Sequence, residues 1–158
     1  MRTLYESLLN DFEDIGKALN PRQEVLQFLK DNYRTPSKFM VSKKPNDNGL
    51  YEVDCSKIVN VCPKRRNIEI LTNDLFVFVN VNDFVLVGCT DLKTLKGSPK
   101  EVGGNFYCDG YINLTSLEGA PKKVGETFVC YPNFTEEDVR YYCDVKGQVK
   151  IIPRYNNI

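Results

Sequence analysis

Six cysteines are the residues of this chain most able to do chemistry. They are Cys55, Cys62, Cys89, Cys108, Cys130 and Cys143. The usual zinc-site spacing needs Cys-x-x-Cys or histidine pairs, and the sequence contains no Cys-x-x-Cys motif and no histidine. Histidine is also the usual base that activates a Ser or Cys nucleophile. We therefore expect no catalytic residue, no metal and no cofactor, and we expect the chain not to be an enzyme.

Cys108 and Cys130 occupy equivalent positions of a repeat and are expected to stack in adjacent coils. Two stacked thiols could form a redox pair or bind a soft metal. The alternative is an inward ladder of small apolar side chains, a role that free cysteine fills well. We favour the ladder, because no activating base or second pair of ligands accompanies the thiols. The other four cysteines are interpreted in the same way.

Acidic side chains supply the remaining candidates for chemistry. Asp109 and Glu136 are the groups that a small enzyme or a nucleotide-binding protein would use. Gly103 and Gly104 do not form a phosphate-binding loop, because no helix start with Lys-Ser/Thr follows them. The acidic run 136–138 could mimic phosphate charge. We favour the alternative, in which these side chains stabilise a helix N-terminus by interacting with the helix dipole.

The charge balance argues against a general nucleic-acid binder. Lysine and arginine together number 21, and aspartate and glutamate also number 21. A balanced chain has no overall field to attract phosphates, so nucleic acid is an unlikely partner. The basic run 63–66 is interpreted as a solvated turn.

Length and hydropathy indicate one folded domain. The chain has 158 residues, of which 42% are hydrophobic and 27% charged. No window approaches the roughly 20 consecutive apolar residues that span a bilayer. The N-terminus also lacks an apolar signal core. We therefore expect a cytoplasmic protein with no membrane partner.

A repeat of 22 residues predicts the elements that position these side chains. The frame Leu92-x-x-Leu95-x-Gly97-x-Pro99-x-x-Val102-Gly103-x-x-Phe106-x-Cys108 returns as Leu114, Leu117, Gly119, Pro121, Val124, Gly125, Phe128 and Cys130. Eight identical positions in adjacent units indicate stacked structural repeats. Weaker copies lie at residues 68–71, where about two extra residues are needed for alignment, and at residues 83–86. Residues 51–55 are expected to form the first strand of the stack.

Each unit predicts one coil of a short leucine-rich-like β-solenoid. The Phe-x-Cys segment is a strand with alternate side chains inward, and the Leu-x-x-Leu segment buries two side chains on the return path. Gly-x-Pro and Val-Gly mark the corners, where glycine tolerates positive φ and proline presets the bend. The strands should form a parallel ladder of about four members, about 4.8 Å apart. The fold class is therefore α+β.

Helices are expected at both ends of this ladder. Apolar residues recur at helical spacing over residues 4–19. Asn20-Pro21 and Gln23 form the start of a second helix that ends near Tyr33, before Thr35-Pro36 imposes an extended backbone. This pair predicts an N-terminal helical cap over residues 1–33.

The rest of the chain is expected to divide into three segments. A connector spans residues 34–49 and includes a turn at 46–49. The solenoid spans residues 50–131. Residues 132–158 form a C-terminal cap, in which Thr135 and Asp138 begin a short helix and a terminal strand follows at 148–152.

The alternation of the strands predicts one shared outward surface. Its residues are Val85, Val87, Tyr107, Asp109, Val129 and Tyr131. Exposed valines and tyrosines side by side are typical of protein interfaces, so these six are the candidate partner-binding residues. The alternative is that a terminal segment, such as the strand at 151–152, covers this surface.

The repeat phrase also carries a resemblance. Leu-Thr-Ser-Leu-Glu-Gly-Ala-Pro-Lys-Lys-Val-Gly, residues 114–125, resembles the leucine-rich-type repeats of uncharacterised bacteriophage and bacterial proteins. The opening Leu-Tyr-Glu-Ser-Leu-Leu, residues 4–9, resembles a leader of phage-encoded proteins. The repeat resemblance covers about half of the chain, which departs from longer relatives in having only two clean repeats. The resemblance implies a phage context and a binding solenoid, and it carries no catalytic residues.

Three functions follow as hypotheses. The first is a phage-encoded, non-enzymatic module that binds a host protein in the host cytoplasm, plausibly to inhibit a defence system. The alternative is a structural or packaged virion protein, in which the same face serves docking or homo-oligomer assembly. The third is a small enzyme or nucleotide-binding protein.

Overall fold

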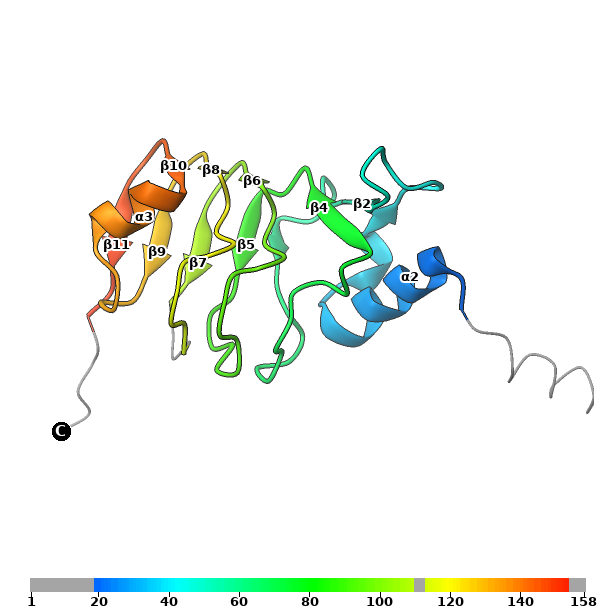
Figure 1. Cartoon of the computed structure of the whole chain (residues 1–158), viewed down its shortest axis with the longest axis horizontal. Helices are drawn as coiled ribbons and strands as arrows, with labels where there is room; N and C mark the ends of the chain where they lie inside the picture. Colours follow the sequence, from blue (N-terminus) through cyan, green and yellow to red (C-terminus); the bar gives the residue numbers. More distant parts are fainter. Residues whose placement is uncertain (1–18, 110–112, 154–158) are drawn as a thin grey trace, which may run out of the picture.

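The chain is a β-solenoid of about four turns (Figure 1). The structure is a computed structural model that describes residues 19–109 and 113–153. The first of the two expected N-terminal helices lies outside these residues. The helices are α2 (Pro21–Asn32), the 3-10 turn η1 (Pro36–Lys38) and α3 (Glu136–Tyr142). The strands are β1 (Met40–Val41), β2 (Tyr51–Asp54), β3 (Asn60–Val61), β4 (Phe76–Val79), β5 (Asp83–Val85), β6 (Glu101–Val102), β7 (Phe106–Cys108), β8 (Lys123–Val124), β9 (Phe128–Cys130), β10 (Asp144–Val145) and β11 (Val149–Ile151).

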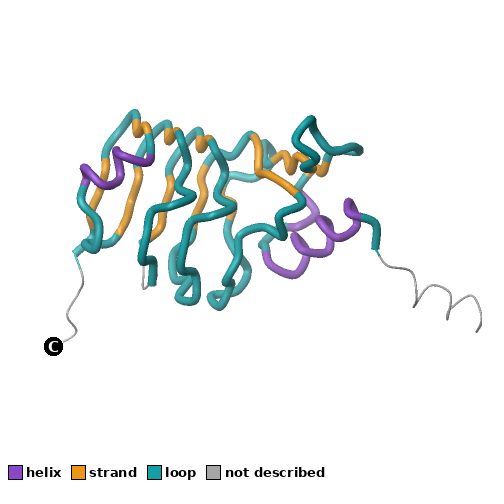
Figure 2. The backbone as a smooth tube through the Cα atoms, viewed as in Figure 1, coloured by secondary structure: helices purple, strands orange, loops and turns teal. Residues whose placement is uncertain are grey.

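The strands form three sheets that follow the solenoid axis. The long sheet has the order β11-β9-β7-β5-β3, and all of its neighbours pair in parallel. The short sheet, β10-β8-β6, is also parallel and lies on a second wall of the same coils. The N-terminal sheet has the order β1-β2-β4. Figure 2 shows the strands aligned from coil to coil, with loops completing each turn.

The parallel ladder expected from the repeat is confirmed, with two differences. The long sheet has five strands, because both the short β3 and the terminal β11 join it. Residues 51–55 do not begin this ladder; β2 pairs in parallel with β4 in the N-terminal sheet instead. The long sheet begins at β3, which pairs with β5 through Val61 and Phe84.

A column of phenylalanines fills the centre of the solenoid. Phe84, Phe106 and Phe128 are register partners in successive strands and are fully buried. The rings of Phe84 and Phe106 are stacked with centroids 6.0 Å apart, and those of Phe106 and Phe128 lie 4.9 Å apart. Phenylalanines at equivalent positions of the repeat therefore pack against one another from one coil to the next.

The Leu-x-x-Leu segments form the buried return path of each coil. Leu92, Leu95, Leu114 and Leu117 are all buried. The following Gly97 and Gly119 have φ of 90° and 85°, the left-handed region that favours glycine. The expectation for the Gly-x-Pro corners is therefore confirmed.

A side-chain ladder of hydrogen bonds links the coils at the start of the long sheet. Asp83 Oδ1 accepts from the backbone N–H of Asn105 at 2.7 Å, and Asn105 Oδ1 accepts from the N–H of Thr127 at 3.1 Å. The Asn105 amide also donates to Glu126 at 3.0 Å. These residues satisfy backbone donors at the corner, which the strand pairing leaves unpaired.

The N-terminal end of the solenoid is closed by α2. The predicted capping box is confirmed, since Asn20 and Gln23 exchange side-chain to backbone bonds. The helix ends in an extended Tyr33, as expected, but Thr35 adopts a left-handed conformation with φ 52° and ψ 48°. The expectation of an extended backbone at Thr35 is therefore wrong. The 3-10 turn η1 that follows reverses the chain before β1, and its Lys38 N–H donates to the Thr35 carbonyl.

Tyr33 connects α2 to the solenoid core. Its ring is completely buried against Phe39 and Phe78, and its hydroxyl donates to the Leu71 carbonyl at 2.8 Å. Burial raises the pKa of Tyr33 well above its ordinary value, so the phenol stays protonated and remains a donor.

Replacing Tyr33 by phenylalanine tests this anchor. We expect Tyr33→Phe to lower the free energy of unfolding by about 1–3 kcal/mol, because it leaves a buried carbonyl without its donor while keeping the ring. Urea denaturation followed by circular dichroism measures the loss. A change below about 0.5 kcal/mol would show that another group, such as water, satisfies Leu71.

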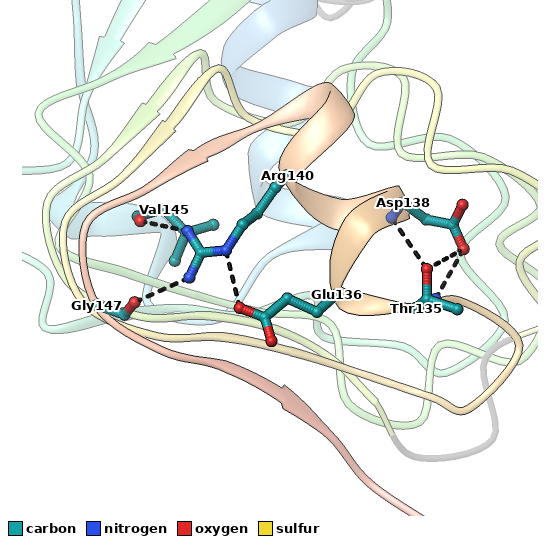
Figure 3. Close-up of polar contacts among 6 residues, drawn as sticks. All are labelled: Thr135, Glu136, Asp138, Arg140, Val145 and Gly147. Atoms are coloured by element: carbon teal, nitrogen blue, oxygen red, sulfur yellow. Dashed lines mark hydrogen bonds and ion pairs between the residues drawn. The ribbon is translucent and has the colours of Figure 1, made fainter.

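The C-terminal helix α3 belongs to the last coil of the solenoid. Thr135 and Asp138 form the predicted capping box (Figure 3). Val139 is fully buried and follows Leu117 by the same 22 residues that separate Leu117 from Leu95. The pairing of β11 with β9 carries the stack through residue 151. The coil stacking thus continues beyond the boundary predicted at residue 131.

Candidate interface on the long sheet

The outward positions of the long sheet form two rows across the strands. In the first row, Val85 pairs with Tyr107, Tyr107 with Val129, and Val129 with Lys150. The second row, Val87, Asp109 and Tyr131, lies two residues further along the chain, just beyond the ends of β5, β7 and β9. The register therefore places Val85, Tyr107 and Val129 on one face, as the alternation requires.

Exposure differs among these residues. Val87 is 51% exposed, whereas Val85, Tyr107, Asp109 and Tyr131 are half-buried. Val129 keeps only 6% of its surface, so the expectation that it lies open is wrong. Its register partners on either side are Tyr107 and Lys150, whose longer side chains leave little of the valine accessible. Tyr107 is thus the large side chain at the middle of the first row.

The terminal strand does not cover this face. Ile151 of β11 is the register partner of Cys130, and Ile152 donates its N–H to the Cys130 carbonyl at 2.8 Å. The strand therefore lies beside β9 and lengthens the sheet. The alternative that residues 151–152 shield the outward rows is contradicted by this pairing.

Asp109 is the acidic group of the candidate interface. Burial raises the pKa of its carboxyl above the ordinary value. Its Oδ1 is buried and has no hydrogen-bond partner among the described residues. Asp109 and Tyr131 are both half-buried.

The acidic run 136–138 is used within α3. Glu136 accepts from Arg140 Nε at 2.9 Å, and Asp138 accepts from Thr135 (Figure 3). Hydrogen bonds from Thr135 lower the pKa of Asp138. These contacts support the interpretation that the run stabilises the helix start.

Five of the six cysteines are buried in the interior of the coils, and Cys62 is half-buried. Cys108 and Cys130 are register partners, and both are buried free thiols. The Cys108 thiol donates to the Val129 carbonyl at 3.3 Å. Burial raises the pKa of Cys130 to about 11 and that of Cys55 to about 12, so these thiols are protonated at neutral pH.

Two further structural findings concern ligands and membranes. Among residues 19–109 and 113–153, no three Cys, Asp or Glu side chains gather closely enough to hold a metal ion. In the same part of the chain, no helix has the length and apolar character needed to cross a bilayer.

A shallow groove on the short sheet was not found from the sequence. Its lining comes from residues of four successive coils and includes Val102, Gly103, Val124 and Gly125. The lysines at its rim are engaged: Lys123 pairs with Glu101 at 3.1 Å and Lys146 with Asp144 at 2.8 Å. The charges of the groove are therefore balanced locally.

Comparison with protein-family models, curated proteins and solved structures finds no match to this chain. The candidate interface is consequently defined by its own geometry.

Proposed function

We propose that this chain is a non-enzymatic protein-binding module of leucine-rich type that binds its partner through the outward face of the long sheet. The resemblance of its repeat to phage and bacterial repeat proteins adds two parts to the proposal. The chain is phage-encoded, and its partner is a host protein, with inhibition of a host defence system as the consequence of binding.

The observation that carries the proposal is the position of Tyr107. It lies between Val85 and Val129 in register, half-buried on the parallel ladder, with Val87 exposed in the next row. Aromatic side chains with apolar neighbours are typical of the energetic centres of protein interfaces. Because the ladder already orders the backbone, binding of a partner costs little further backbone conformational entropy.

The interpretation of the cysteines agrees with a binding role. A thiol must ionise to act as a nucleophile or metal ligand, and burial opposes ionisation at Cys55, Cys108 and Cys130. The buried thiols therefore serve packing between coils.

A charge introduced on the face tests the proposal. We expect the double variant Tyr107→Asp/Tyr131→Asp to lose at least about tenfold in affinity for the host protein that the wild type recovers from lysate, because it puts carboxylates in the apolar contact. Tyr141→Asp is the matched control, since Tyr141 is 83% exposed on α3 and lies outside the long sheet.

The readout is pull-down with mass spectrometry, followed by titration of the recovered protein. The proposal requires that wild type and Tyr141→Asp bind equally and that the double variant, with an unchanged melting temperature, does not. Equal recovery by all three would show that the partner binds elsewhere.

A further inference from the structure

The two ends of the solenoid differ in whether other groups hydrogen-bond to their edge strands. At the N-terminal end, β1 runs antiparallel to β2 and forms the edge of the N-terminal sheet. Arg22 of α2 then donates to the carbonyls of Val41 and Ser42 at 3.1 and 3.0 Å. Beyond β3, residues 32–34 pair with residues 62–64 through two backbone hydrogen bonds. These contacts engage edges that would otherwise accept another strand.

At the C-terminal end, the edge of the short sheet is also occupied. Arg140 Nη1 donates to the Val145 carbonyl at 2.9 Å, and Nη2 donates to the Gly147 carbonyl at 3.4 Å (Figure 3). One coil earlier, the register partner Val124 gives its carbonyl to the Lys146 N–H at 2.9 Å. The Arg140 guanidinium thus takes the place of a backbone donor from a next coil.

Among residues 19–109 and 113–153, no side chain occupies the edge of the long sheet in this way. Within the described residues β11 is the last strand of the order, and no strand pairs with its far edge. The Phe128 N–H donates to Gln148, and the Ile152 N–H donates to Cys130. In a parallel ladder of this register, Val149 and Ile151 direct their N–H and C=O groups away from β9. Two donors and two acceptors therefore face outward along the axis.

The side chains around this edge extend the apolar core to the surface. Phe134, Tyr142, Val149 and Ile151 pack against the core but remain only partly buried. The corresponding positions in earlier coils, such as Phe106 and Phe128, are fully covered by the next coil. Within the part of the chain that the structure describes, the end of the long sheet therefore offers backbone groups without a partner beside half-exposed apolar side chains.

Lys150 determines which strand can add to this edge. It is exposed and points to the outward face between Val149 and Ile151. A second copy pairing antiparallel through the same outward groups would place Lys150 opposite Lys150. Like charges directly opposite each other destabilise a strand pair, and opposite charges stabilise it. The residue that blocks self-pairing therefore favours an acidic residue in the added strand.

We propose that the β11 edge binds an extended segment of a partner protein by strand addition, with an apolar-acidic-apolar sequence at its centre. The acidic side chain lies beside Lys150. The flanking apolar side chains cover Val149 and Ile151, as a further coil would. Pro153 limits the contact to this short stretch, because it has no N–H to offer. This edge adjoins the outward face assigned to the proposed function, with which it shares Lys150.

Two synthetic peptides test the proposal with the full chain. Each is nine residues long, fluorescently labelled and rich in threonine, with Val-Glu-Val at the centre of one and Val-Lys-Val at the centre of the other. We expect saturable binding of the Val-Glu-Val peptide with Kd on the order of 10–100 µM, and binding of the Val-Lys-Val peptide weaker by about threefold to tenfold.

Variants of β11 identify the edge. Ile151→Pro removes a donor that points away from β9 and also replaces a side chain that packs against the core, so its melting temperature is measured beside its binding. With the fold retained, the Val-Glu-Val peptide should bind at least about tenfold more weakly. Ile151→Val is the matched control and should bind within about twofold of wild type, since it keeps the backbone donor. Lys150→Glu should reverse the preference between the two peptides.

Three results would overturn the proposal. They are no binding of the Val-Glu-Val peptide at about 1 mM, undiminished binding to Ile151→Pro, or a wild-type dimer in sedimentation that Ile151→Pro dissociates. The last would assign the edge to a second copy. The variant Tyr107→Asp/Tyr131→Asp should bind the peptide like wild type, so failure here and failure of the outward face are distinguishable.

Discussion

Gly125→Ala is expected to lower the free energy of unfolding by about 3 kcal/mol or more. A Cβ at Gly125 would lie 2.1 Å from the Gly103 carbonyl oxygen and 3.0 Å from its carbon. Both are backbone atoms of the neighbouring coil, so neither can move as the end of a flexible side chain does. The coils must separate locally, which weakens the hydrogen bond from the Gly125 N–H to the Val102 carbonyl.

Gly103→Ala is the matched control one coil earlier. Its added Cβ would meet only the Val81 carbonyl oxygen at 3.4 Å, an ordinary contact. Neither glycine has a positive φ, so alanine introduces no backbone strain at either site. We expect Gly103→Ala to be neutral or to stabilise the protein by up to about 1 kcal/mol, because alanine restricts the unfolded chain.

Thermal unfolding of the two variants beside wild type gives the comparison. The melting temperature should fall by roughly 6–12 °C for Gly125→Ala and stay within a few degrees for Gly103→Ala. If Gly125→Ala does not fold, Gly147→Ala repeats the test in the last coil, where the Cβ would lie 2.1 Å from the Glu126 carbonyl oxygen. Similar melting temperatures for the two original variants would refute the coil-to-coil contact.

These glycines show where the repeat predicted the structure and where it did not. The sequence predicted glycine at both corners for its positive φ, and Gly97 and Gly119 have it. At Gly125 the requirement comes instead from the approach of an adjacent coil. A repeat identifies equivalent residues, but the distance between coils depends on how they stack.

The capped and uncapped edges could not be predicted for a similar reason. The capping boxes of α2 and α3 are local patterns, and the sequence identified both. Arg140 acts on carbonyls five and seven residues away, and only the path of the last coil brings them together. Likewise, the sequence predicted a strand at residues 148–152, but its pairing with β9 is seen only when the coils are stacked in three dimensions.

The candidate interface was predicted in part. Alternation placed Val85, Tyr107 and Val129 on one face, because the period of two holds wherever the ladder is regular. Burial of Val129 was missed, since it depends on the sizes of its neighbours in adjacent coils, including Lys150 of a strand that had been considered a cover.

Phe106→Ala is expected to cost about 3–5 kcal/mol of unfolding free energy. Its ring is fully buried at the middle of the aromatic column, between Phe84 on one side and Phe128 on the other. Removing it leaves a cavity bounded by two coils, and neither can collapse without disturbing its own parallel pairing. Urea denaturation with fluorescence and far-ultraviolet circular dichroism measures the loss.

Phe134→Ala makes the same chemical change in the last coil, where the ring is only half-buried, so a loss of about 1–2 kcal/mol is expected. The difference between the two variants follows from the solenoid, in which each coil is stabilised by its neighbours. Phe106 contributes to the interfaces on both of its sides, and its loss separates the N-terminal coils from the C-terminal ones. We therefore expect Phe106→Ala also to broaden the transition and lower its denaturant dependence, as the two halves unfold separately. Equal losses from Phe106→Ala and Phe134→Ala, with equally sharp transitions, would contradict a fold held together through its central aromatic column.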